Sequence, residues 1–287
     1  MSGESFYKPT LDLKFPLRYT FCGDDKMLEI AKRINLSPLL LEKLAHIEKV
    51  KIQSLADKCM SDGFFVLKRC NDIIRLAVML ELAVRVKQRY DAVGIDEKIY
   101  YDTMSDIRIW CEENGNRGLK NYGWIKNHVS FELFRLGRLQ FQLYECKNRT
   151  LLYNKLPFAY GEKLVYIHIP AGERLDTEQC KASLEASKKF FSQFFPDYSY
   201  RYYFCESWLL FENNRDFMSQ DSNIVSFMSL FDICYSVKVD KQAIERIFKK
   251  RCLFKRNYPE NTSLQLAAKK YMQGGNRLGI GIGVIAK

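Results

Sequence analysis

Hydrophobic residues in the first 135 positions recur every three or four residues, the spacing of amphipathic helices. This pattern covers three segments, at 24–53, 64–94 and 96–115. It breaks near Pro38 and stops at Gly94, a residue suited to a helix C-cap. Glycines at 115, 118 and 123 mark the loop that follows. We therefore predict a helical N-terminal domain over residues 1–135.

The hydrophobic period changes to two near residue 135, which indicates strands. The clearest case is 135–145, where Leu139, Phe141 and Leu143 alternate with polar residues. The same reasoning predicts further strands at 150–156, 162–169, 198–211, 233–239 and 278–285. In the last of these, the glycines leave room for close backbone contact.

Helices are expected between these strands. One fits 177–195, where Asp176 can cap the N-terminus and Gln179 can complete a capping box. A short helix follows Ser222, a natural N-cap, and two more fit 240–251 and 262–273. The helix at 177–195 connects two strands as a crossover, so those strands should be parallel. The fold class is α+β, with the mixed sheet of residues 136–287 flanked by helices.

Composition excludes several classes of protein. With 47% hydrophobic residues, the chain can bury sizeable cores, so we do not expect disorder. The sequence contains no run of eighteen apolar residues, so we do not expect a membrane span. The N-terminus does not resemble a signal peptide. The nine cysteines form no C-x-x-C pair, which favours reduced thiols in a cytoplasmic protein. The three histidines are too far apart for us to expect a metal site.

The net charge of +11 favours an anionic partner. Residues 238–256 hold eight basic and two acidic residues. This stretch is interpreted as a solvated helix face, as a contact for a phosphate or an acidic acceptor, or as a nucleic-acid site. Because no nucleic-acid-binding motif accompanies it, we do not expect nucleic acid as a partner.

A series of short motifs adds to this order of elements. They are YYDTMSDIRIW (100–110), GLKNYGWI (118–125), LFRLGRLQFQ (133–142), IHIPAGERL (167–175), CESWLL (205–210), SNIVSF (222–227) and NTSLQLA (261–267). From about residue 20 to the end, the chain resembles a bacterial acyltransferase-domain family. That family has a helical N-acyltransferase N-terminal domain and a GNAT-like C-terminal domain.

The resemblance implies transfer of an acyl group from acetyl-CoA or another acyl-CoA to an amine. The acceptor would be a small molecule or a peptide, with no membrane and no metal involved. Direct attack on the thioester is expected, without an acyl-enzyme. The competing interpretation is a non-catalytic protein that binds a ligand or partner on a degenerate GNAT scaffold. Acyl chain length, acceptor and oligomeric state stay open.

Four residues are candidates for catalysis. His168, on the strand before the turn, is the base or orients the thioester, or else is a hydrogen-bonded histidine of a half-buried strand. Glu206 is expected to activate the amine through a water. Cys205 or Ser207 would protonate the leaving thiolate or contact the pantetheine, although a buried cysteine is more often a core residue. A hydrolase built on Cys205 and His168 is not expected, because no G-x-S-x-G or cysteine-protease signature is present.

The resemblance places the coenzyme A pyrophosphate at the turn after this strand. The expected cofactor-binding residues are Ile169, Ala171, Gly172, Glu173, Arg174, Leu175 and, for the pantetheine arm, Asn223. The turn departs from the usual Q/R-x-x-G-x-G/A pattern, since it has one glycine and an acidic helix start. Arg174 is the compensating charge.

The helical half contributes a further set of polar and aromatic residues within family-like motifs. They line an acceptor pocket or form a polar network: Asp102, Thr103, Asp106, Trp110 and Trp124.

Overall fold

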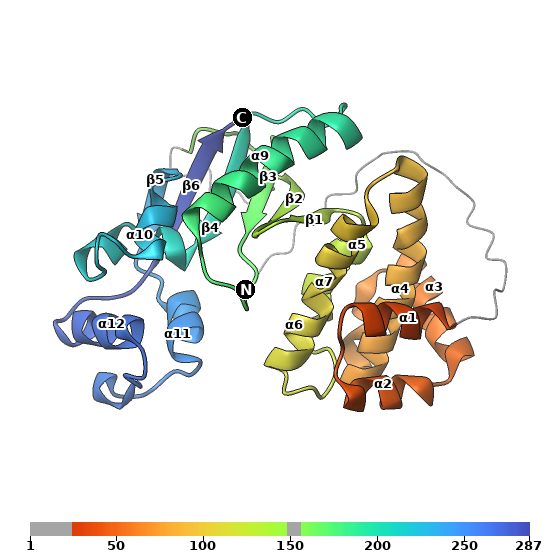
Figure 1. The fold of residues 1–287 in the computed structure, drawn as a ribbon. Coiled ribbons are helices and arrows are strands. Elements are labelled where there is room, and N and C mark those ends of the chain that lie inside the picture. Colours follow the sequence, from red (N-terminus) through yellow and green to blue (C-terminus); the bar gives the residue numbers. More distant parts are fainter. Residues whose placement is uncertain (1–24, 148–155) are drawn as a thin grey trace. The chain divides into compact units, whose positions relative to one another are not determined.

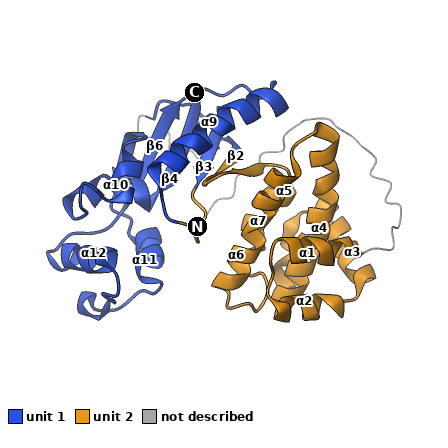
Figure 2. Ribbon diagram, viewed as in Figure 1, with its two compact units in different colours: residues 1–7, 143–168, 174–287 blue, residues 8–142, 169–173 orange. Residues whose placement is uncertain are grey.

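A computed structural model describes residues 25–147 and 156–287 (Figure 1). These residues divide into two compact units (Figure 2). The helical unit comprises the described residues up to 142 together with 169–173. The sheet unit comprises the described residues of 143–168 and residues 174–287. The predicted strand at 150–156 lies almost wholly outside the described residues, and the predicted domain boundary after residue 135 stays a prediction.

The helical unit contains seven α-helices among its described residues. They are α1 (Lys26–Arg33), α2 (Pro38–Ala45), α3 (Lys49–Asp62), α4 (Asp72–Val93), α5 (Glu97–Met104), α6 (Asp106–Glu113) and α7 (Tyr122–Val129). Pro38 begins α2, and Gly94 ends α4 in the left-handed conformation with φ of 78°, as predicted. Leucines such as Leu40, Leu44 and Leu76 are buried in its core.

Three details of this half differ from the sequence prediction. Residues Phe64–Arg69 form a 3-10 helix instead of the start of the long helix, because α4 begins at an N-cap, Asn71. The single helix expected at 96–115 is two helices, with Ser105 between them. The loop expected after residue 113 ends earlier than predicted, since α7 begins at Tyr122.

Six strands form one mixed sheet in the order β1-β2-β3-β4-β6-β5. They are β1 (Leu133–Leu136), β2 (Leu139–Glu145), β3 (Lys163–His168), β4 (Tyr202–Ser207), β5 (Asp232–Val237) and β6 (Ile280–Ala286). β3 and β4 are parallel, which confirms the predicted crossover, and β6 is antiparallel to both β4 and β5. The α+β fold class is confirmed.

The strand predicted at 135–145 is an antiparallel hairpin of β1 and β2. Leu136 pairs with Leu139, so only Gly137 and Arg138 form the turn. Gly137 has φ of 73°, which suits glycine at the first position of a two-residue hairpin turn. The segment that the alternating pattern predicted as one strand is therefore interrupted by a turn, and Arg138 lies at the tip of the resulting hairpin.

Four helices of the sheet unit follow the predicted order. They are α9 (Thr177–Phe194), α10 (Asn223–Met228), α11 (Lys241–Phe248) and α12 (Ser263–Gln273). Asp176 caps α9 by accepting from the Gln179 N–H at 2.9 Å, and Ser222 caps α10, both as predicted. α9 lies across one face of β3 and β4 (Figure 1), where Ser187 donates to the Tyr203 hydroxyl at 2.9 Å.

The glycines of the last strand permit the close packing that their sequence predicts. A Cβ on Gly281 would stand 1.9 Å from the Leu210 carbonyl oxygen. A second small core lies beneath α11 and α12, built from residues such as Ile244, Phe248 and Tyr258. Among the residues that the structure describes, no helix combines the length and apolar character needed to cross a membrane.

Candidate active site

The turn that joins β3 to α9 holds six of the predicted cofactor-binding residues, at positions 169 and 171–175. Its residues Ala171 to Arg174 are exposed, while Ile169 and Leu175 are half-buried. Gly172 has φ of 95°, and a Cβ there would meet nothing within 4 Å. Glycine is therefore needed at this position for its backbone conformation, and the space around it is open.

Two buried arginines of the β1–β2 hairpin hold this turn. Arg138 donates one hydrogen bond to the Pro170 carbonyl at 3.0 Å and another to the Glu173 carbonyl at 2.9 Å. A guanidinium is suited to this task because it presents several donors in a rigid plane. Arg138 was not predicted as a site residue, because the alternation of residues 135–145 indicates one continuous strand and not a hairpin with Arg138 in its turn.

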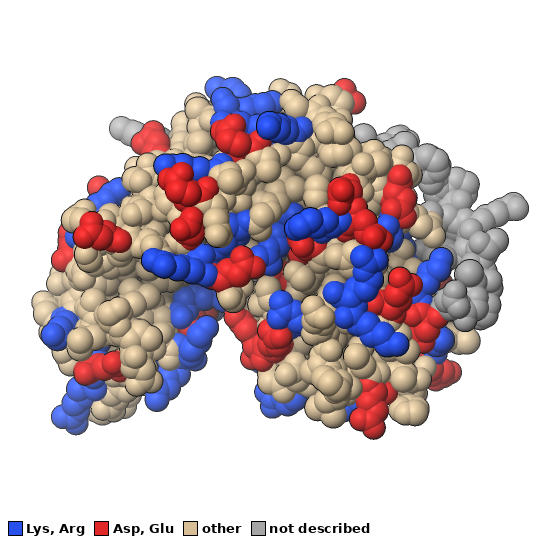
Figure 3. Space-filling model, viewed as in Figure 1, with Lys and Arg blue, Asp and Glu red and all other residues tan. Residues whose placement is uncertain are grey.

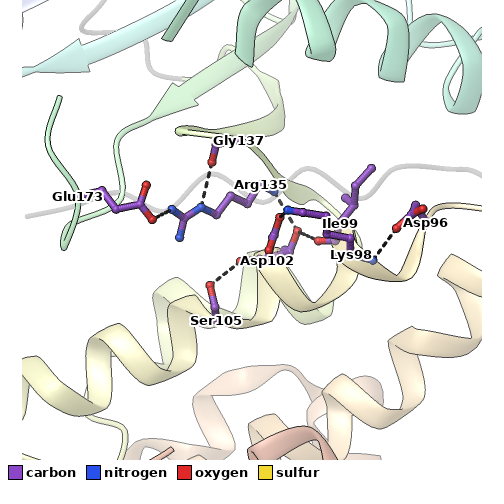
Figure 4. Close-up of polar contacts among 9 residues, drawn as sticks. Asp96, Lys98, Ile99, Asp102, Ser105, Arg135, Gly137 and Glu173 are labelled. Atoms are coloured by element: carbon purple, nitrogen blue, oxygen red, sulfur yellow. Dashed lines mark hydrogen bonds and ion pairs between the residues drawn. The ribbon is translucent and has the colours of Figure 1, made fainter. Parts of the chain in front are cut away.

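Arg135 supports the turn from its other side. Its guanidinium donates to the carboxylate of Glu173 and, at 3.1 Å, to the Gly137 carbonyl (Figure 4). Its backbone N–H donates to the Thr103 hydroxyl at 2.9 Å. That hydroxyl in turn donates to the Ile99 carbonyl within α5. Glu173 was predicted to lie at the phosphate site. Its carboxylate forms an ion pair with Arg135 of the same chain.

The N-terminus of α9 carries its own negative charge. Asp176 is the N-cap, and Glu178 lies in the first turn. An acidic cap satisfies the positive end of the helix, so it leaves less of that potential for a bound phosphate. The N-terminus of α9 is therefore less favourable to an anion than a helix start without acidic residues.

His168 and Glu206 share one face of the sheet unit. The His168 ring stacks on the Tyr166 ring with centroids 4.1 Å apart. Tyr166 lies beside Phe204 in the parallel register, and their rings are 4.8 Å apart. Because side chains alternate along a strand, Glu206 lies on the same face as Phe204. The four side chains line one end of this strand pair.

This aromatic surrounding changes the acid–base properties of two groups. Burial raises the pKa of the Glu206 carboxyl, since an apolar setting disfavours its charged form. A carboxyl with a raised pKa is better matched to proton abstraction near neutral pH. Burial, together with the Glu206 charge, raises the pKa of Tyr166 well above its ordinary value, so its hydroxyl is a poor proton donor.

Cys205 and Ser207 lie on the opposite face of β4, the face covered by α9. Cys205 is buried, and burial followed by the Glu206 charge raises the pKa of its thiol. A thiol in this condition resists forming the reactive thiolate. Ser207 is also buried, and its hydroxyl accepts the Leu209 N–H at 3.2 Å. The four predicted catalytic residues are therefore divided between two faces of one strand pair.

Two other residues have clear positions. Asn223 is the first residue of α10, and Ser222, not Asn223, provides the cap by accepting the Val225 N–H at 3.2 Å. The Asn223 side chain is thus not required for capping. Trp208 packs against the core beneath α11 and α12, as a packing residue would.

A buried polar network lies within the helical unit. Asp106 accepts from the Trp124 indole at 2.6 Å, and its carboxylate lies 3.1 Å from His128 Nε2. Burial opposes its ionisation, but the neighbouring His128 and the hydrogen bond from Trp124 outweigh that effect and lower its pKa. Of the helical candidates, Thr103 connects to Arg135, whereas Asp102 pairs with Lys98 on the surface.

Glu132, which no sequence motif indicated, has an unusual carboxyl group. Burial raises its pKa to about 7, against the opposing effects of Lys126 and Arg89. It follows Phe131, a non-glycine residue with φ of 62°. No sequence signal distinguishes this glutamate from a surface residue. Within residues 25–147 and 156–287, no group of three or more metal-binding side chains could hold a metal ion.

Comparison with known families yields two matches along the chain. The model described as "N-acyltransferase N-terminal domain" matches residues 27–131. The model described as "GNAT-like C-terminal domain" matches residues 133–285, more than half of the chain. A search among curated proteins found no match.

Several solved structures share the fold. A crystal structure of an acyltransferase in complex with decanoyl-CoA and teicoplanin matches with a TM-score of 0.73 and 18% identity, covering 93% of this chain and 89% of that one. A complex with CoA and 10C-teicoplanin gives a TM-score of 0.74 and 18% identity, covering 92% and 88%. A complex with decanoyl-CoA gives 0.74 and 18%, covering 94% and 90%. At this level of identity, the likeness concerns the fold.

Proposed function

The chain belongs to the acyltransferase family in which an N-acyltransferase N-terminal domain precedes a GNAT-like C-terminal domain, and from this premise we propose that it transfers an acyl group from acyl-CoA to an amine. The observation that carries the proposal is the turn after β3, which Arg135 and Arg138 brace and which we propose as the binding site for the coenzyme A pyrophosphate. The similar structures named for their complexes with CoA and decanoyl-CoA support acyl-CoA as the co-substrate.

We assign the acid–base work to the face that His168 and Glu206 share. The amine nitrogen attacks the thioester carbonyl, a C–N bond forms and the C–S bond breaks. Glu206, whose pKa burial raises, takes the proton that the amine loses, directly or through a water. His168, stacked on Tyr166, orients the reacting groups or shares this proton. The released thiolate takes up one proton, which restores the balance.

Direct attack is favoured over an acyl-enzyme. A covalent route would need an activated nucleophile beside a base. Cys205 is buried with a raised pKa, and it lies on the face of β4 opposite Glu206. Ser207 lies on that same face and already accepts a backbone N–H. We therefore give Cys205 and Ser207 supporting roles, as core residues or contacts for the pantetheine.

The acceptor is proposed to be an amine of a small molecule or a peptide. Support comes from the similar structures, two of which are named for complexes with teicoplanin or 10C-teicoplanin. The competing function is ligand binding without catalysis on the same fold. One observation favours it, namely the acidic cap of α9 beside a turn with a single glycine.

The deciding experiment measures binding and turnover separately. Thermal melting with acetyl-CoA, octanoyl-CoA and decanoyl-CoA tests binding, and a ligand at 100 times its Kd should stabilise by about 2.7 kcal/mol. Thiol release with each acyl-CoA and a panel of amines then tests transfer. Stabilisation without amine-dependent thiol release would establish the non-catalytic alternative. No stabilisation by any acyl-CoA would overturn the proposal.

A further inference from the structure

The loop between α11 and α12 exposes apolar and basic side chains together. We call residues 249–256, with the sequence KKRCLFKR, the basic tip. Leu253 is 90% exposed and the adjacent Phe254 is 54% exposed. Single exposed apolar residues need no explanation, but two neighbours at the end of one loop, surrounded by five cations, are an unusual surface.

The basic tip is held on a packed base. Phe248 and Tyr258, which flank it in sequence, pack against each other with ring centroids 4.5 Å apart. Arg251 pairs with Asp240 at 2.6 Å, and the Lys255 ammonium donates to the Met272 carbonyl. These contacts fix the two ends of the loop. Leu253 and Phe254 are therefore exposed to solvent on a loop whose two ends are held by packing and hydrogen bonds.

The cations around these two side chains are arranged for an anionic surface. Lys249, Lys250 and Arg256 are exposed, and the Arg256 guanidinium lies 5.4 Å from the Phe254 ring centre. Residues 238–273 hold ten basic and three acidic residues, a surplus of seven. Figure 3 shows lysine and arginine side chains around the α11–α12 end of the sheet unit, with mostly neutral surface and a few acidic atoms between them.

From this combination we infer that the basic tip binds the surface of an anionic lipid bilayer. Leu253 and Phe254 would enter the boundary between headgroups and acyl chains, while Lys249, Lys250 and Arg256 would contact the lipid phosphates. This inference concerns peripheral binding, which the lack of a spanning segment does not address. It departs from the sequence expectation that no membrane is involved, and it is independent of the proposed acyl transfer.

A bilayer explains the surface better than a nucleic acid does. Phosphate contacts alone would account for the cations, and a base could stack on Phe254. The aliphatic Leu253 is the most exposed of the large apolar side chains among the described residues, and a nucleic acid offers it nothing comparable to the interior of a lipid surface. The exposure of these two apolar side chains therefore favours a lipid surface over a nucleic acid as the ligand of the basic tip.

The test measures vesicle binding by sedimentation with the full chain. Vesicles of phosphatidylcholine alone are compared with vesicles that contain about one-third phosphatidylglycerol. We expect binding to the anionic vesicles only, weakening with salt. K249Q/K250Q should weaken it about 25-fold, since each basic residue near such a surface contributes about fivefold. L253S/F254S should weaken it by at least about tenfold, because inserted apolar area is lost.

Matched controls come from the helical unit. K43Q/K51Q removes the same charge from two other exposed lysines, and Phe65→Ser removes another exposed aromatic ring. Neither should change vesicle binding, and the melting temperature of each variant verifies its fold. Equal binding to neutral vesicles, equal losses in the controls, or no binding to either kind of vesicle would overturn the inference. So would retention of a DNA duplex by L253S/F254S without vesicle binding by the unaltered chain.

Discussion

Replacing Arg138 with methionine should uncouple the turn after β3 from its support. The change removes two hydrogen bonds, to the carbonyls of Pro170 and Glu173, at 3.0 and 2.9 Å. A hydrogen bond from a charged donor contributes about 1.5–3 kcal/mol net, so the pair holds the turn with about 3–6 kcal/mol. Methionine keeps much of the side-chain volume, so the loss is mainly one of hydrogen bonding.

Part of that energy should appear as weaker ligand binding. A turn that is no longer held must be ordered by the ligand, which costs affinity. If the binding free energy falls by the contribution of one of these hydrogen bonds, about 1.5–3 kcal/mol, acyl-CoA affinity falls about 10- to 150-fold. Arg138→Lys keeps the charge but not the rigid fork, so its affinity should lie between the two.

Two measurements test this reasoning. Calorimetric titration with acetyl-CoA gives the affinity, and amide hydrogen exchange at residues 171–174 reports whether the turn opens more often. Arg201→Met is the control, because the Arg201 side chain is exposed: it pairs with Glu162 and lies 5.4 Å from the Tyr202 ring centre, away from residues 169–175 in its contacts. Unchanged affinity and exchange in Arg138→Met, or the same loss in Arg201→Met, would refute the bracing role.

Three further predictions follow from single sites. Glu206→Gln should lower turnover about 100- to 10,000-fold without changing acyl-CoA affinity. In the unaltered protein, kcat/KM should fall at acidic pH with a pKa above the ordinary glutamate value, because burial raises the pKa of Glu206. The variant should lack this fall. Gly281→Ala should cost more than about 4 kcal/mol in chemical unfolding, because its Cβ would meet the Leu210 carbonyl at 1.9 Å. Gly274→Ala, with 3.5 Å to its nearest neighbour, should be tolerated. The pKa of Glu132 is raised to about 7 in the folded chain, so between about pH 4.5 and 7 the folded chain holds a proton that the unfolded chain has lost. The free energy of unfolding should therefore fall as the pH rises through this range. Urea unfolding at pH 5 and pH 8 measures this fall, and Glu132→Gln should remove it.

Local signals in the sequence predicted the elements around the site. Asp176 and Ser222 begin α9 and α10 as N-caps, because their side chains accept N–H groups that any helix start leaves without partners. The crossover through α9 makes β3 and β4 parallel, as the order of elements requires. These features depend on a few neighbouring residues or on chirality, so they can be predicted without knowledge of the packing.

The support of the turn could not be predicted in the same way. Arg138 and Gln140 lie at the polar positions of an alternating segment, which predicts a solvated face, and Arg135 pairs with Gln140 across the hairpin. All three are buried, because the hairpin is covered on that side as well and its arginines have partners about 35 residues away. The Gly-Arg pair flanked by hydrophobic residues was the one local signal, and it indicates a two-residue hairpin.

If the turn after β3 binds phosphate as proposed, Arg135 and Arg138 compensate for the glycines that it lacks. A glycine-rich turn lets the backbone close around phosphate, and the turn after β3 has only one glycine, Gly172, whose conformation requires it. An anion near a turn is opposed by carbonyl oxygens and acidic groups that point toward it. Here the Pro170 and Glu173 carbonyls are bound by Arg138, and the Glu173 carboxylate is bound by Arg135. The buried arginines thus withdraw three acceptors from the turn and add positive charge beside it. We therefore propose that side-chain support maintains a phosphate site at this turn, where the backbone lacks further glycines.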